Sequence, residues 1–233
     1  SPLQAEPKGG GELKLTVGKA LNFLPETQLL FDEDVSLSGL QQEFSWANLM
    51  PGWKKLSLQL GQHALLTENT FITSHLLAAK VSSDWFWNDW KLRSALSYSH
   101  YQEADALIAQ NFNLGYQGAF SFNNRITNGR YDSKFQVLDA FTALQWQGIK
   151  GWPLQFHADL IQNLAAQDQG LGYLIGTRWG QLKHQGDWLF AYDYRMMQQD
   201  ANLALMVDDF YAGTDVAGHT FSLGVKTTDS TSV

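Results

Sequence analysis

Residues 186–226, GDWLFAYDYRMMQQDANLALMVDDFYAGTDVAGHTFSLGVK, contain the pattern that decides the fold. From Asp187 to Met196 the side chains alternate strictly between two sets. One set is aromatic or apolar throughout, and the other includes charged side chains of both signs. A period of two is typical of a β-strand, because successive side chains point to opposite faces. The pattern therefore predicts a strand with one apolar and one polar face, and residues 217–226 predict a second strand of this kind.

The same alternation runs along most of the 233 residues. It predicts ten strands, at 12–20, 37–47, 53–63, 71–82, 90–101, 134–147, 152–163, 171–182, 187–196 and 217–226. Short turns alternate with long connections, of which 102–133 and 199–216 are prominent. Because no strand–helix–strand rhythm appears, we expect one all-β domain of sequential antiparallel hairpins, preceded by a linker at 1–11.

Three local features accompany the strands. Residues 103–112 (EADALIAQNF) and 201–207 each have the composition of a short helical turn. Residues 85–87 (WFW) lie between two pairs of turn-forming residues, which predicts a turn that carries two tryptophans. Tryptophan at such a turn is typical of a membrane interface.

The composition excludes several classes of protein. A net charge of −7 and a pI of about 5.2 argue against a nucleic-acid partner, which requires a basic surface. Without cysteine, neither disulfides nor thiolate metal sites can form. No run of 18 apolar residues predicts a transmembrane helix, but barrel strands need only about 9–11 residues, half of them apolar. A mean hydropathy of −0.25 agrees with such strands, and nine tryptophans fit either an interface girdle or a soluble β-sandwich core.

No catalytic motif appears, so neither an enzyme nor a cofactor is expected. His157 and Asp159 share a strand face and have the residue types of a catalytic pair or half a metal site. We favour the simpler interpretation that the two are polar residues on the water-facing side of one strand. The acidic runs 32–34 and 208–209 offer carboxylates to Ca²⁺ but lack the spacing of a calcium loop. We therefore interpret them as solvated loops, and no metal site is predicted.

In a transmembrane barrel, one face of the sheet contacts lipid and the other faces the polar interior. The residues expected to line the interior are Arg93, Asp139, His157, Asp159, Arg178, Asp193, Arg195 and Lys226. The residues expected to face lipid or form a girdle are Trp146, Trp152, Phe156, Tyr173, Trp179, Trp188, Phe190, Tyr192, Tyr194 and Phe221. Because the interior set is mixed in sign, the sequence predicts no strong preference for anions or cations.

Several segments, in this order, resemble a porin family of Gram-negative bacterial outer-membrane β-barrels. They are ELKLTVGKALNF (12–23), FDEDVSLSGL (31–40), YDSKFQVLDAFTAL (131–144), WPLQFHADLIQN (152–163), LGYLIGTRWG (171–180), GDWLFAYDY (186–194) and DANLALMVDDFYAGTDVAGH (200–219). The resemblance implies an outer-membrane barrel in contact with lipid that lets small hydrophilic solutes or ions diffuse passively. Family members carry further strands before the first of these segments. The resemblance therefore implies the C-terminal part of a larger barrel or one half of a split one. Either the ten strands close by themselves, or a homo-oligomer or a second chain or segment completes the barrel.

Two other functions remain open from the sequence. One is a non-conducting barrel with a structural or assembly role in a cell-envelope complex. The other is a soluble antiparallel β protein that binds carbohydrate through exposed tryptophans. The soluble protein would leave cells without detergent, whereas both barrels would require it.

Overall fold

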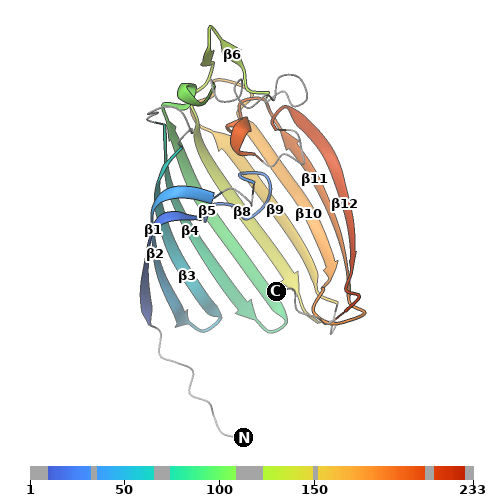
Figure 1. Ribbon diagram of the computed structural model, residues 1–233. Coiled ribbons are helices and arrows are strands. Elements are labelled where there is room, and N and C mark those ends of the chain that lie inside the picture. The colour runs from blue at the N-terminus through green and yellow to red at the C-terminus, as the bar shows by residue number, and fades with distance from the viewer. Residues whose placement is uncertain are drawn as a thin grey trace, which may run out of the picture.

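The computed structural model describes residues 10–32, 36–65, 74–108, 123–148, 152–207 and 213–228. Ten strands form one antiparallel sheet in the order of the sequence (Figure 1). They are β1 (Gly11–Leu21), β2 (Ser36–Met50), β3 (Trp53–Ala64), β4 (His75–Trp87), β5 (Trp90–Gln102), β8 (Gln136–Trp146), β9 (Leu154–Asn163), β10 (Leu171–Gly180), β11 (Trp188–Met197) and β12 (Val216–Val225). The predictions of an all-β fold and of ten sequential antiparallel strands are confirmed.

The connections differ from the sequence expectations in three places. The predicted turn at 85–87 is wrong, because β4 continues to Trp87 and the turn is Asn88–Asp89. Asn88 adopts a positive φ of 50°, which asparagine tolerates better than most residues. The predicted helical turns shorten to the 3₁₀ helices η1 (Ala104–Leu107) and η2 (Ala204–Met206), and residues 109–112 lie outside the described part. A small hairpin of β6 (Ile126–Thr127) and β7 (Arg130–Tyr131) was not predicted.

The sheet is deeply curved, but its first and last strands do not pair (Figure 1). Within the described residues, β1 forms a ladder only with β2, and β12 only with β11. The structure is therefore an open curved sheet. We call the end with the short β2–β3, β4–β5 and β10–β11 turns the turn end, and the opposite end the loop end. No helix in the described part is long and apolar enough to span a membrane.

The two faces of the sheet differ in chemistry. We call the face that contacts residues 22–32 the inner face and the opposite one the outer face. Strand alternation sends charged and polar side chains inward and aliphatic or aromatic ones outward. Exposed outer residues occur on every part of the sheet and include Leu13, Val17, Leu60, Val81, Leu96, Leu160, Ile175 and Leu223. This outer surface has no protein cover among the described residues.

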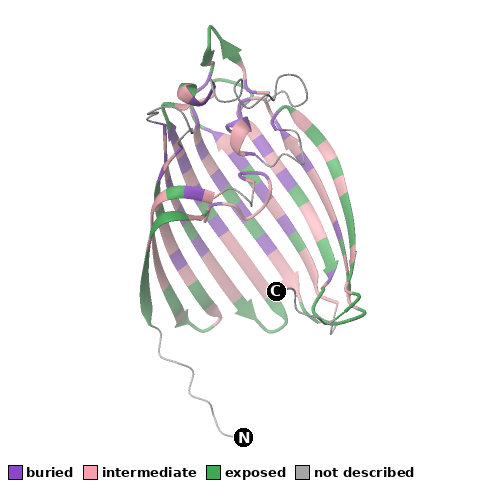
Figure 2. Cartoon of the chain, viewed as in Figure 1, coloured by how far each residue is buried: buried purple, intermediate pink, exposed green. Residues whose placement is uncertain are grey.

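A hydrophobic cluster fills the inner side of the sheet toward the loop end, where buried positions concentrate (Figure 2). Residues 24–31 and 201–207 contribute to it together with inward side chains from β4, β8, β9 and β10. Its largest fully buried members are Leu24, Leu29, Leu30, Phe31, Leu76, Leu107, Phe135, Ile161, Met197 and Leu203. The loop end of the interior is thus packed with apolar side chains.

Ion pairs and hydrogen bonds connect residues 124–125 to the segments around 168 and 199–202 at the loop end. Arg125 reaches two carboxylates, Asp168 at 2.5 Å and Asp200 at 2.6 Å. The side-chain amide of Asn124 donates to the carbonyls of Gln199 and Asn202, both at 2.8 Å. These bonds hold segments far apart in sequence in one layer across the loop end.

Candidate functional site

Residues 22–32, between β1 and β2, lie against the inner face, and we call them the inner segment. Its anchor is Glu26. Lys80 Nζ of β4 lies 2.6 Å from Glu26 Oε1, and Arg93 of β5 donates from Nε and Nη2 at 2.7 and 2.8 Å. Lys80 also donates to the carbonyl oxygens of Phe23 and Leu24, at 2.9 and 3.1 Å. One buried lysine therefore holds both the backbone and the acid of the segment.

The charge of Glu26 follows from these contacts. Burial alone raises the pKa of its carboxyl group, because a buried anion loses hydration. The hydrogen bond from Arg93 and the charges of Lys80 and Arg93 outweigh burial, so the pKa lies below its usual range. Glu26 is therefore ionised near neutral pH and forms a bidentate, charge-assisted pair with Arg93.

Further bonds fix the rest of the inner segment. The hydroxyl of Thr27 donates to the Asp159 carboxylate of β9. Near the other end, the Asn202 amide donates to the Leu30 carbonyl at 2.6 Å. The Asp32 amide donates to the carbonyl of Met206 at 3.0 Å. The segment thus contacts strands from the middle of the sheet as well as the loop before β12.

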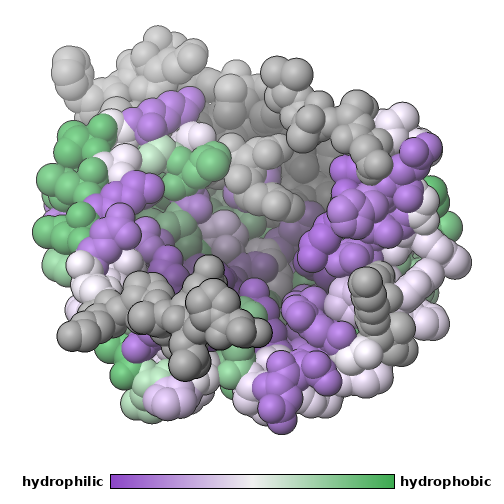
Figure 3. Space-filling view, turned by 90° about the horizontal axis from the view of Figure 1, so that it is seen from below, coloured by the Kyte–Doolittle hydropathy of each residue, from purple (hydrophilic) through white to green (hydrophobic). Residues whose placement is uncertain are grey.

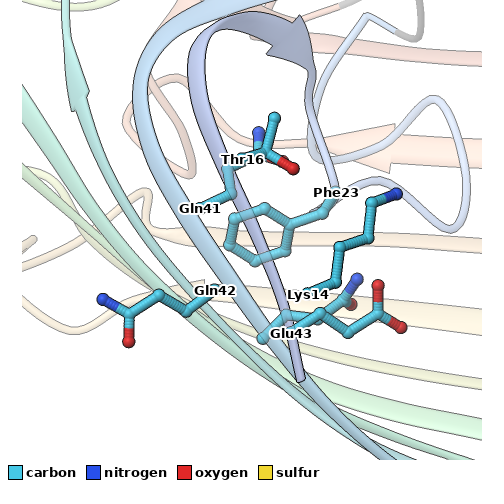
Figure 4. A pocket seen from close by; sticks show the side chains of 7 residues that line it. Lys14, Thr16, Phe23, Gln41, Gln42 and Glu43 are labelled. Atoms are coloured by element: carbon cyan, nitrogen blue, oxygen red, sulfur yellow. The ribbon is translucent and has the colours of Figure 1, made fainter. Parts of the chain in front are cut away.

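Phe23, near the start of the inner segment, lies over the inner face of β1 and β2 (Figure 4). A hollow of about 30 Å³ separates its ring from Lys14, Gln41 and Glu43, which surround it. This space holds a water or two and is too small for a solute. We interpret the hollow as packing around the aromatic ring rather than as a binding site.

Two cavities larger than this hollow lie between the inner segment and the turn end. One cavity, of about 170 Å³, is bordered by β5, β8, β9 and β10. Another, of about 470 Å³, extends toward β11 and β12. Glu26 and Arg178 line both cavities, and we call the two together the chamber. Viewed from the turn end, the molecule is hollowed and hydrophilic side chains border the hollow (Figure 3).

Seven of the eight residues predicted to line the interior lie on the inner face. Arg93, His157, Arg178 and Asp193 line the chamber. Asp139, Asp159 and Arg195 are at most 2% exposed and lie behind the chamber. Lys226 follows β12, is partly exposed, and donates its backbone amide to the carbonyl of Asp187 in the turn next to it.

His157 does not pair with Asp159, which shares its strand face, but with Asp193. Its Nε2 lies 2.7 Å from Oδ1 of Asp193, two strands away. Gly176 lies between them in the register, and a Cβ there would collide with both side chains. Asp159 accepts from Thr27 instead. No group of three metal-ligating side chains occurs in the described part, and of the two acidic runs only Asp32 falls within it.

The nine tryptophans gather at the turn end of the sheet. They are Trp46, Trp53, Trp85, Trp87, Trp90, Trp146, Trp152, Trp179 and Trp188. Several contact one another: the rings of Trp53 and Trp85 stack with centroids 4.7 Å apart, and Trp152 meets Trp188 edge to face at 5.2 Å. We call this group the tryptophan belt. Five of its members are at least 36% exposed.

The other residues predicted to face lipid also lie on the outer face. Tyr173 and Tyr194 contact each other toward the loop end, with centroids 6.0 Å apart. Phe156, Phe190, Tyr192 and Phe221 lie between these tyrosines and the tryptophan belt. On β5, Trp90 and Tyr98 are eight positions apart, which is about 26 Å along the strand.

The comparisons with known proteins add no identity. No family model, no curated protein and no solved structure matches the chain.

The inner segment is the part of the candidate site that the sequence did not predict. Only Asp32, its last residue, belongs to an acidic run that was interpreted as a solvated loop, and Leu24, Leu29, Leu30 and Phe31 are at most 1% exposed. The signal was the density of apolar residues around Pro25 and Glu26, which a solvated loop does not need. The sequence alone does not show that the segment lies against the sheet, because its partners Lys80 and Arg93 are 54 and 67 residues further along the chain from Glu26.

Proposed function

We propose that this chain forms the wall of an outer-membrane β-barrel channel that admits small hydrophilic solutes or ions. The observation that carries the proposal is the contrast between the two faces of one curved sheet. The outer face is apolar and ends in the tryptophan belt, whereas the inner face carries ionised residues around the chamber. This arrangement fits lipid on one side and water on the other.

The orientation follows from the unequal connections. In outer-membrane barrels the short turns face the periplasm and the long loops face the outside. The tryptophan belt would then lie at the periplasmic interface, where indole rings are favoured. The chamber would open toward the periplasm, and the inner segment would separate it from the packed loop end.

The edges of the sheet place a condition on this proposal. Unpaired strand edges are intolerable in lipid, because their amide and carbonyl groups find no water there. In the membrane β1 and β12 must therefore pair with one another, with a second copy or with further strands. The described chain leaves the outer edges of both strands open.

A non-conducting barrel with a structural role is the second candidate, and one observation favours it. The hydrophobic cluster fills the interior at the loop end. Barrels of about eight strands commonly have an interior filled by side chains and conduct little. A soluble carbohydrate-binding protein is disfavoured, because soluble monomers rarely expose a contiguous apolar surface as extensive as the outer face.

Liposome swelling tests the proposed function. Detergent-purified protein is reconstituted into liposomes, which are diluted into isotonic solutions of sugars of increasing size. Swelling that is fast for the smallest sugars and slows with size supports a water-filled channel. Liposomes that contain folded, protease-resistant protein and do not swell in any sugar or small electrolyte contradict it.

A further inference from the structure

A row of four side chains crosses the inner face at the turn end of the chamber. The register places Lys91 opposite Gln145, Gln145 opposite Gln155, and Gln155 opposite Arg178. All four line the cavity of about 170 Å³. Directly opposite residues on one face have Cβ atoms about 5 Å apart. Two cations therefore flank two amides in one continuous line.

The positive charge of this row is not matched by nearby acids. Among the described residues, no carboxylate lies within ion-pair distance of Lys91 or Arg178. Lys91 Nζ lies over the ring of Phe86 on β4, 5.4 Å from its centroid, a contact that supplies no negative charge. The one acid in the cavity wall, Glu26, is already held by Lys80 and Arg93.

The space above the row is kept open by a small residue. On the next row toward the loop end, Ala143 lies opposite both Arg93 and His157. Its short side chain leaves the gap that the cavity occupies. A volume of about 170 Å³ is below the roughly 300 Å³ of pockets that hold drug-sized ligands, so the space suits a small ion.

We propose that the row Lys91–Gln145–Gln155–Arg178 binds a small oxyanion, with the chemistry of a phosphate or a carboxylate. This inference rests on the proposed function, because the anion reaches the row through a water-filled interior. Arg178 offers a planar fork that matches two oxygens, and Lys91 adds a point charge at the other end of the row when its side chain turns from the Phe86 ring toward Gln145. The two glutamine amides donate from between them. The row gives this end of the chamber a preference for anions that the mixed charges of the sequence did not predict.

Isothermal titration of the full chain in detergent micelles with inorganic phosphate, at low salt, tests the site. The variants are Arg178→Gln and Lys91→Gln, and the control is Lys183→Gln, an exposed lysine of the β10–β11 turn at the same end. We expect binding in the wild type and in the control, and affinity about tenfold weaker in each variant, since each loses a charge-assisted contact. No binding in the wild type, or equal affinity in all four proteins, overturns the proposal.

Two further measurements keep the result decisive. Arg178→Lys retains the charge but loses the planar guanidinium, so its affinity for phosphate should fall between those of the wild type and Arg178→Gln. Arg178→Lys also takes the place of Arg178→Gln in the titration if Arg178→Gln does not fold. Conductance in potassium chloride is recorded separately. A conducting channel that does not bind phosphate overturns this inference and leaves the proposed function standing. A silent protein that binds phosphate through Arg178 supports the site and contradicts the channel.

Discussion

The substitution Glu26→Gln tests whether the inner segment is held to the wall by one buried carboxylate. It removes the charge that faces Lys80 and Arg93 and changes the shape of the side chain little. Lys80 is 3% exposed and has no other ion pair among the described residues. Arg93 is 39% exposed and keeps Asp84 at 3.5 Å, so the loss falls mainly on the lysine.

The expected magnitude follows from that burial. Removing one partner of a buried ion pair costs about 3–5 kcal/mol, because the other charge is left uncompensated. Glutamine still offers an oxygen to one donor, so we expect the low end, about 3 kcal/mol of unfolding free energy. A change of this size shifts the docking equilibrium of the segment more than a hundredfold.

The matched control is Glu43→Gln. Glu43 pairs with Lys55 at 3.1 Å, but the two side chains are 26% and 47% exposed, so the loss should be below about 1 kcal/mol. Urea unfolding in detergent, followed by tryptophan fluorescence, gives the free energies. Chymotrypsin cleavage near Phe23 and Phe31 reports whether the segment has left the wall. Equal free energies for the two variants, with the segment protected in both, would refute the role assigned to Glu26.

The same pair predicts a dependence on pH. The pKa of Glu26 lies below its usual value of 4.5, so the stabilisation is complete above that pH and is lost as the pH falls through the lowered pKa. The stability difference between wild type and Glu26→Gln should therefore shrink in acid below about pH 4.5. A difference that is constant from pH 7 to pH 3 would show that the charge of Glu26 contributes nothing.

Three further changes test other parts of the account. Gly176→Ala should break the His157–Asp193 contact and lower the urea midpoint by the equivalent of about 2 kcal/mol, whereas Gly218→Ala, with open space around it, should not. Asp200→Asn, at a 1%-exposed acid that accepts from Arg125 and Ser133, should cost about 2 kcal/mol and loosen the loop end to proteases. Asp168→Asn, at a 66%-exposed acid on the same arginine, should cost little. In bilayers with brominated lipids, tryptophan fluorescence should be quenched most by bromines near the headgroups. Strongest quenching by bromines at the bilayer centre would contradict the placement of the tryptophan belt at the membrane interface.

The strands were predictable because a period of two is a local property of the sequence. Trp188 to Met196 alternate within ten residues, and β11 follows from them without knowledge of any partner. The faces of Arg93, Arg178 and Asp193 followed from the same alternation. Even the extension of β4 to Trp87 was within reach, since Asn88–Asp89 is a two-residue hairpin turn.

The contacts within the interior were not predictable, because they depend on which strands become neighbours. His157 shares a face with Asp159 in the sequence, but its bond goes to Asp193 across β10, where Gly176 leaves room. The role of Glu26 likewise depends on Lys80 and Arg93, which lie 54 and 67 residues further along the chain. The row Lys91–Gln145–Gln155–Arg178 likewise comes from four strands, and its members become neighbours only through the register.

Single-channel recording in a planar lipid bilayer tests the central claim most directly. Protein purified in detergent from native membranes is added to one side in symmetric potassium chloride, and its folded state is verified by heat-dependent gel mobility. The account predicts discrete, stable conductance steps, with larger steps for Glu26→Gln because its inner segment leaves the wall. A folded protein that inserts into the bilayer and gives no steps, as wild type or as Glu26→Gln, would contradict the channel and support a non-conducting barrel.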